Sequence, residues 1–249
     1  MGNKVVNFLN NINEDKFYIN ISFYNNYLKW LSSTLKMSLH KIRSEIFEDI
    51  KIKKNGKVLF IGCGLGDEIN FFYKKFKKKN TQIYGQDYSK KFILQTAKKF
   101  KNKNIKLTIS DAHALPYKTN YFDLVFHFGG INQFKNIKKA IFEMSRVCKK
   151  NGEVFFSDEG MGPWRKKTEL YLALKENNSL WSESPPIHLL PDNSKNVKIN
   201  WILKNNFYTV KFQLDSDEKD INPNITHKSP RGGSISTRYE KKYNKKLSF

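Results

Sequence analysis

The stretch VLFIGCGLGDE, residues 58–68, joins an apolar run typical of a β-strand to the start of a helical pattern. Its three glycines, Gly62, Gly64 and Gly66, stand at every second position. Glycine lets the backbone adopt positive φ and lets a ligand approach without interference from a Cβ atom. The helix that follows offers unpaired N–H groups to such a ligand. A packing role explains a turn of this kind equally well, so the surrounding residues decide its meaning.

The spacing of the glycines argues against the common dinucleotide cofactors. The fingerprint G-x-G-x-x-G of NAD- and FAD-binding turns requires a third glycine at position 67, where this chain has Asp67. A carboxylate at the start of the helix repels a pyrophosphate, but it suits a ligand that carries an ammonium or sulfonium charge. The turn therefore favours a cationic nucleoside cofactor.

Two further acidic residues follow at the ends of the next two predicted strands. Asp87, in YGQDYS, stands 21 positions after Gly66, where a carboxylate can bind both ribose hydroxyls of an adenosine. Its alternative role is a helix N-cap, for which Ser89 is the better candidate. Asp111 and Ala112, in SDAHALPY, can accept a hydrogen bond from an adenine amino group and bind the ring edge.

Strand and helix patterns alternate after the glycine turn and predict an α/β domain. Such alternation implies right-handed crossovers and a mostly parallel sheet with helices on both faces. Two final strands, 197–203 and 207–214, are joined at Lys204-Asn205-Asn206 as a hairpin. The earlier strands are expected near 57–61, 81–86, 105–109, 122–127 and 153–157, and the helices near 67–79, 89–100 and 135–150.

The chain divides into three predicted parts. Residues 1–50 carry an apolar stripe from 22 to 50 at helical spacing and predict an N-terminal helical cap. Residues 51–214 form the main domain, in which the Gly- and Pro-rich segment 159–196 is an insert and a predicted substrate lid. Residues 215–249 form a polar, basic tail.

Five segments in order carry a resemblance to a known family: VLFIGCGLGDE, YGQDYS, SDAHALPY, FDLVFHFGG and EMSRVCKKNGEVFFSD. Their succession over residues 57–158 resembles the class I S-adenosylmethionine-dependent methyltransferases, closest to the small-molecule group that includes the ubiquinone and menaquinone methyltransferases. The resemblance implies a Rossmann-like, seven-stranded sheet in the order 3-2-1-4-5-7-6, with strand 7 antiparallel. That topology agrees with the predicted terminal hairpin.

The resemblance also implies roles for individual residues. The glycines would hold the methionine end of S-adenosylmethionine, Asp87 the ribose, and Asp111 with Ala112 the adenine. The adjoining residues Cys63, Tyr88, His113 and His127 complete the predicted cofactor site. No metal site is predicted.

Methyl transfer is expected to proceed by in-line displacement, which depends mainly on holding the acceptor close to the methyl group in a dry pocket. A general base is required only if the acceptor must lose a proton. Three residues near the expected cleft compete for that role: His127, Asp158 and Glu159. A structural imidazole bonded to the backbone is the alternative role for His127.

The acceptor is predicted to be a small molecule, and two sets of residues bear on its nature. Arg165 and Arg231 can bind an anionic acceptor through planar guanidinium groups, with surface salt bridges as the alternative. Tyr24 and Trp164 favour a flat or apolar acceptor, with ordinary packing as the alternative. The departure from the quinone methyltransferases is largest in the insert, so their substrate is not carried over.

Charge and cysteine content bound the remaining function classes. The net charge of +22 fits a solvated, lysine-rich surface, with a polyanion-binding face as the alternative. A tRNA or rRNA methyltransferase is therefore a rival hypothesis, although no Asn-Pro-Pro-Tyr motif follows the fourth strand; a non-catalytic cofactor-binding relative is another. Two cysteines without metal-like spacing, and no apolar run long enough for a membrane span, predict a cytoplasmic protein.

Overall fold

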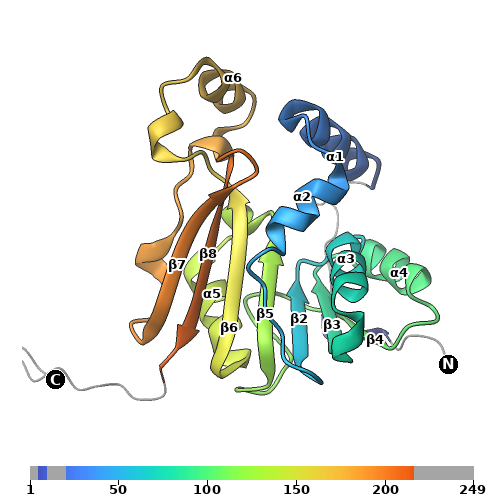
Figure 1. The fold of residues 1–249 in the computed structure, drawn as a ribbon. Coiled ribbons are helices and arrows are strands. Elements are labelled where there is room, and N and C mark those ends of the chain that lie inside the picture. Colours follow the sequence, from blue (N-terminus) through green and yellow to red (C-terminus); the bar gives the residue numbers. More distant parts are fainter. Residues whose placement is uncertain (1–4, 10–20, 216–249) are drawn as a thin grey trace, which may run out of the picture. The chain divides into compact units, whose positions relative to one another are not determined.

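The computed structural model describes residues 5–9 and 21–215, and a mostly parallel eight-stranded sheet lies at their centre (Figure 1). The strands run in the order β1-β4-β3-β2-β5-β6-β8-β7, and only β8 is antiparallel to its neighbours. Their bounds are β1 Val5–Asn7, β2 Lys57–Ile61, β3 Gln82–Asp87, β4 Ile105–Ile109, β5 Phe122–Phe128, β6 Cys148–Glu159, β7 Ser194–Ile202 and β8 Phe207–Leu214.

Seven of these strands confirm the predicted fold class and order, including the antiparallel strand of the terminal hairpin. The predicted number of strands was wrong by one, because β1 adds an eighth strand at the edge of the sheet. Val5 of β1 lies opposite Leu107 of β4 in a parallel pair, and its side chain packs against the core. The N-terminal segment 1–50 is therefore not purely helical, since it also contributes a strand.

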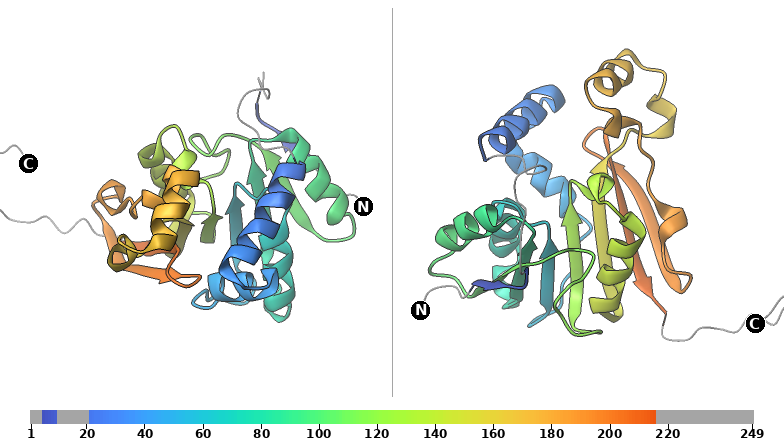
Figure 2. Two further views of the ribbon diagram at one scale, coloured as in Figure 1. Left: turned by 90° about the horizontal axis from the view of Figure 1, so that it is seen from above. Right: turned by 180° about the vertical axis from the view of Figure 1, so that it is seen from behind.

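Alternating side chains of β2 show how the two faces of the sheet are covered. Val58 and Phe60 point into a core shared with α3 (Asp67–Lys75) and α4 (Lys90–Lys99). Leu59 and Ile61 point into a second core, shared with α5 (Ile137–Val147). The views from front and back show α3 and α5 on opposite faces (Figures 1 and 2). The side chains of Val58, Leu59, Phe60 and Ile61 are each at most 2% exposed, as a central strand of a doubly covered sheet requires.

The expected leading helix over 22–50 is two helices, α1 (Ile21–Leu35) and α2 (Leu39–Ile46). Lys36 breaks the stripe with a φ of 49°, and the Ser38 hydroxyl then caps α2 by accepting from the amide of Lys41. Leu31, Leu35, Ile42 and Ile46 remain buried in one core, so the apolar stripe was recognised correctly although the helix is broken.

The expected insert connects β6 to β7 and contains α6 (Glu169–Asn177). Its fully buried Trp181 contacts Trp30 of α1 and Phe207 of β8, with ring centroids 6.3 and 5.5 Å away. The insert and α1 therefore meet above the carboxyl end of the sheet. The short 3-10 turns of the chain are η1 Lys77–Lys79, η2 Ile131–Gln133, η3 Pro163–Arg165, η4 Ser179–Ser182 and η5 Ile187–Leu189.

The part of the chain that the structure describes contains no helix that is long and apolar enough to cross a membrane. Arg231 and all but the first residue of the predicted tail 215–249 lie outside the described residues.

Candidate functional site

The three glycines of the turn after β2 have distinct surroundings. All three are left-handed, with φ of 58° at Gly62, 51° at Gly64 and 71° at Gly66. A Cβ on Gly66 would lie 2.7 Å from the ring of Phe100, and a Cβ on Gly62 would lie 3.2 Å from the ring of His127. A Cβ on Gly64 would meet nothing within 4 Å. Gly66 thus serves packing, and Gly64 leaves room for a bound molecule.

Asp87, at the end of β3, is bonded directly to this turn. Its Oδ2 accepts from the amide of Gly64 at 2.8 Å, and its Oδ1 accepts from the amide of Ser89 at 2.8 Å. Burial raises the pKa of Asp87 to about 6, and the backbone amides around it, including that of Tyr88, partly oppose the shift. Ser89 supplies the cap of α4, so Asp87 is left to serve the turn.

Gln86 was missed by the sequence analysis and connects three strand ends. Its Oε1 accepts from the amide of Gly62 at 3.3 Å, and its Nε2 donates to the carbonyl of Ser110. The side chain is 1% exposed. A polar residue next to the end of an otherwise apolar buried strand was the available signal. Gln86 holds the turn after β2 in register with the turn after β4.

The predicted adenine-binding residues follow β4 and form a bonded group. His113 Nε2 accepts from the amide of Asn136 at 3.2 Å, so Nδ1 donates to Asp111 Oδ1, 2.6 Å away. Ala112, which stands between Asp111 and His113 in the sequence, is buried. The Asp111 side chain is 42% exposed. The Asp111 carboxylate thus keeps one oxygen available toward solvent while His113 orients the other.

His127, on β5, is fully buried beside the glycine turn. Its Nδ1 donates to the carbonyl of Ile61 at 2.9 Å, and its buried Nε2 has no hydrogen-bond partner among the described residues. Burial lowers the pKa of His127 to about 4, so the ring is neutral at pH 7. This geometry favours the structural alternative, although a role toward a ligand stays a prediction.

Asp158 and Glu159 form a buried acidic pair at the end of β6. Asp158 Oδ1 accepts from the amide of Gly130 at 2.9 Å, and Oδ2 accepts from the amide of Asn132 at 2.7 Å. Glu159 Oε1 accepts from the hydroxyl of Tyr27 on α1. Burial and the adjacent Glu159 raise the pKa of Asp158 well above its usual range. No ion pair to either carboxylate is found within residues 21–215.

Three residues that the sequence analysis did not assign complete this second group. The side-chain Nδ2 of Asn132 donates to the Glu159 carbonyl at 3.0 Å, and the Tyr208 hydroxyl donates to Asn132 Oδ1 at 2.7 Å. Tyr27 lies 132 residues before its partner Glu159. Tyr27 stands three residues after Tyr24 in the sequence, but no local pattern connects it to β6.

The remaining predicted residues are not gathered at one place. Tyr24 of α1 lies near Phe92 of α4, with ring centroids 6.2 Å apart, and burial followed by the charges of Glu68 and Asp67 raises its pKa. The other predicted residues have protein partners or face solvent. Trp164 is 64% exposed, and its ring contacts that of Trp201. Arg165 donates to the carbonyl of Lys204, and the Cys63 thiol lies in the core.

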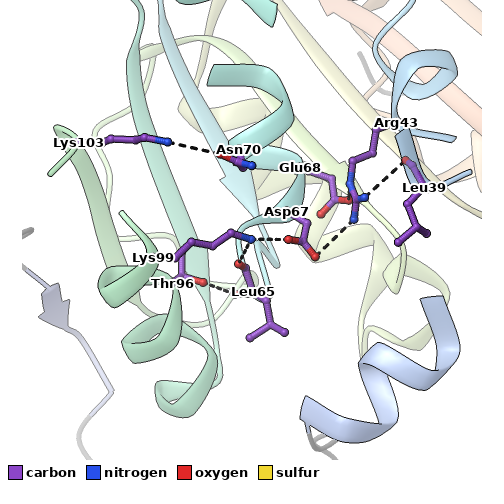
Figure 3. A network of polar contacts seen from close by, with 10 residues as sticks. Leu39, Arg43, Leu65, Asp67, Glu68, Asn70, Thr96, Lys99 and Lys103 are labelled. Carbon is purple, nitrogen blue, oxygen red and sulfur yellow. Dashed lines mark hydrogen bonds and ion pairs between the residues drawn. The ribbon is translucent and has the colours of Figure 1, made fainter. Parts of the chain in front are cut away.

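Asp67, expected to face a cationic ligand, is instead bound by two side chains of the protein (Figure 3). Arg43 Nη2 lies 3.4 Å from Asp67 Oδ2, and Lys99 Nζ pairs with Asp67 Oδ1. The charge of Asp67 is therefore compensated, and Asp87 is the ionisable acid bonded to the glycine turn. A groove of about 600 Å³ between α2 and α3 is lined by Asp67 and Arg43, but by none of Gly64, Asp87 and Asp111.

The chain is similar to known methyltransferases. A family model described as a methyltransferase domain matches residues 52–216. Demethylmenaquinone methyltransferase from Staphylococcus carnosus is 32% identical over 139 residues, which cover 55% of this chain and 56% of that protein. The protein of the same name from Staphylococcus aureus (strain Newman) is 29% identical over 126 residues, 50% and 52% of the two chains. The chain thus spans about half the length of the curated relatives it matches.

Two solved structures support the fold. One, assigned as an S-adenosyl-L-methionine-dependent methyltransferase from Methanococcus maripaludis, has a TM-score of 0.60 at 20% identity and covers 85% of this chain and 100% of that chain. The other is phosphoethanolamine N-methyltransferase 2 from Haemonchus contortus in complex with S-adenosyl-L-methionine. It has a TM-score of 0.60 at 13% identity and covers 79% of this chain and 58% of that chain. At these identities the likeness concerns the fold alone.

Proposed function

We propose that this chain, which belongs to the class I S-adenosylmethionine-dependent methyltransferase family, transfers a methyl group from S-adenosylmethionine to a small-molecule acceptor. The observation that carries the proposal is the pair of Gly64 and Asp87. Gly64 has open space where a side chain would be, and its amide is bonded to a buried carboxylate at the next strand end. A nucleoside with a ribose diol and a charged methionine end suits that arrangement.

The donor site would be built from residues at the ends of β2, β3 and β4. Asp87 accepts from backbone amides on both oxygens and would accept in addition from the ribose hydroxyls. Asp111, with one oxygen free of protein partners in the described residues, would accept from the adenine amino group. When bound, the donor supplies an electrophilic methyl group on a sulfonium. The protein's contribution is to hold the nucleophile in line with it and to exclude water.

The acceptor would approach between α1 and the end of β6. Tyr27 and Glu159 already join these two elements by a hydrogen bond, which supports Glu159 as the group that positions the acceptor or removes its proton. His127 is less suited, because both its burial and its bond to Ile61 favour a fixed neutral ring.

An aromatic or apolar acceptor is better supported than an anionic one. The acidic pair would repel an anion, and the guanidinium of Arg165 is used by the turn between β7 and β8. Tyr24 and Tyr27 offer aromatic surface on α1, the helix that lies over the carboxyl end of the sheet (Figure 1).

The proposal is tested in two stages with the full chain. Calorimetric titration with S-adenosylhomocysteine should give micromolar binding that Asp87→Ala weakens at least about 100-fold. The control is Asp123→Ala, because Asp123 lies on the same sheet but at its opposite end. Radiolabelled methyl transfer should then be measured on a panel that includes a naphthoquinol, a phenol, phosphoethanolamine and RNA. Absence of donor binding would contradict the proposal. Transfer to RNA alone would support the rival RNA methyltransferase.

A further inference from the structure

Arg43, on α2, joins the N-terminal helices to the start of α3 (Figure 3). Its Nε lies 3.1 Å from Glu68 Oε1, and its Nη2 lies 3.4 Å from Asp67 Oδ2. Nη1 donates to the carbonyl of Leu39 at 3.5 Å. The side chain is only 13% exposed. Three nitrogens of one guanidinium therefore have three different partners in a partly buried place.

The same helix start is held from the other side by α4. Lys99 pairs with Asp67 and donates to the carbonyl of Leu65 at 3.2 Å. The Thr96 hydroxyl donates to the carbonyl of Gly64 at 2.8 Å. Side chains from α2 and α4 thus fix the glycine turn and the first residues of α3 from opposite sides, as Figure 3 shows.

The residue type at position 43 is informative in this chain. Of its 45 basic residues, 40 are lysine and 5 are arginine, so lysine is the usual cation. A lysine ammonium cannot reach three acceptors in the planar arrangement that a guanidinium offers. An arginine here indicates that the geometry of the contact matters, beyond the presence of a positive charge.

The charges around the helix start are balanced by Arg43 and Lys99. Burial raises the pKa of Glu68 and Arg43 counteracts that shift. The other groups that face Glu68 are Asp67 on α3, Tyr24 on α1 and the Cys63 thiol, and none of them is a cation. Without Arg43, Glu68 would be a buried carboxylate lacking its cation, which is costly enough to move the side chain or to bind a proton.

We propose that Arg43 is a positioning residue for the methyl donor: by neutralising Glu68 and Asp67 it holds the start of α3 and the glycine turn in the conformation that binds the donor. This inference rests on the proposed function, because it concerns the same donor site. It makes donor affinity depend on α2, a helix that lies outside residues 52–216 matched by the family model.

Arg43→Ala is expected to weaken S-adenosylhomocysteine binding about tenfold, measured by calorimetry, and to leave kcat at saturating donor within about twofold. Arg43→Lys should fall between Arg43→Ala and the unmodified chain, and it provides a folded comparison if the alanine variant is unstable. Lys41→Ala is the matched control, because Lys41 is on the same helix and its ion pair with Glu45 is on the surface. It should not change donor affinity.

A double variant separates neutralisation from a merely structural contact. In Arg43→Ala with Glu68→Gln the orphaned charge is gone, so donor affinity should return to within about threefold of the unmodified chain. Removing Arg43 raises the pKa of Glu68 further, so above pH 7, where Asp87 stays ionised, affinity of Arg43→Ala should fall as pH rises and Glu68 loses its proton. The unmodified chain and the double variant should show no such slope. Asp87 titrates below this window and affects all of them alike.

Two results would overturn the inference while leaving the proposed function intact. One is unchanged donor affinity in Arg43→Ala, with normal binding by the unmodified chain. The other is failure of Glu68→Gln to recover binding in the double variant. If the unmodified chain bound no S-adenosylhomocysteine, the proposed function would fail and this inference with it.

Discussion

The ends of β2 to β4 and the ends of β5 and β6 are built in different ways. In the first region, the bonds of Asp87 and of Asp111 join residues within 23 positions of each other in the chain. In the second, Glu159 bonds Tyr27 from 132 positions away and Tyr208 bonds Asn132 from 76 positions away. The proposed donor side thus arises within consecutive strand–turn units, and the proposed acceptor side depends on packing of distant elements. A change in one region should therefore leave the other largely unaffected.

The largest effect is expected at Asp87. Asp87→Ala should weaken S-adenosylhomocysteine binding at least about 100-fold, because the loss of hydrogen bonds from two hydroxyls to a charged group costs roughly 1.5–3 kcal/mol each. Calorimetry measures the affinity, and near-ultraviolet circular dichroism checks that the fold survives. Binding within threefold of the unmodified chain would show that Asp87 only supports the turn.

Glu159→Gln should affect the other region alone. We expect turnover to fall about tenfold while donor affinity stays within twofold, because Glu159 contacts α1 and makes no contact with the glycine turn. Replacing the carboxylate beside buried Asp158, whose pKa Glu159 helps to raise, should also raise the melting temperature by about 2–4 °C. Steady-state kinetics and thermal unfolding measure the two effects. A loss of donor affinity equal to the loss of turnover would show that the regions are not independent.

The pH dependence of donor binding tests the state of Asp87. The ionised carboxylate is the acceptor of hydrogen bonds, and its pKa is raised to about 6. Donor affinity should therefore be constant above pH 7 and fall by up to about tenfold per pH unit below pH 6. Titration at pH 5.5, 6.5 and 7.5 measures this, with Asp87→Asn as the variant that should lose the dependence. A dependence retained by Asp87→Asn would assign it to another group.

The smallest effect is expected at His127, which lies between the two regions. His127→Asn keeps a donor for the Ile61 carbonyl, so turnover at saturating donor should stay within about twofold. Since the pKa of His127 is lowered to about 4, no histidine-dependent change in rate is expected between pH 5.5 and 8. A tenfold loss of turnover would instead assign His127 a catalytic role.

The same difference explains what could be predicted from the sequence. The order of the seven main strands was implied by the family resemblance, and the place of Gly64 and Asp87 followed from patterns within short segments. The bond between Tyr27 and Glu159 could not be predicted, because its residues share no local pattern and meet only through the packing of α1. The strand β1 was missed because Val5, Val6 and Asn7 are too few for periodicity to indicate a strand. Lys36 broke the first helix without a glycine or proline to signal the break.

The two outer strands of the sheet bear on how the protein avoids association with other chains. On one side, β1 has only three residues, so it offers a short edge for pairing. On the other, β7 carries Lys195 and Lys198, and its pairing with β8 shifts register between them, where Asn196 has a φ of 52°. Short length on one edge, with charge and an irregular register on the other, makes both edges poor templates for an additional strand. The same fold that brings the donor site together is therefore protected against edge-to-edge aggregation.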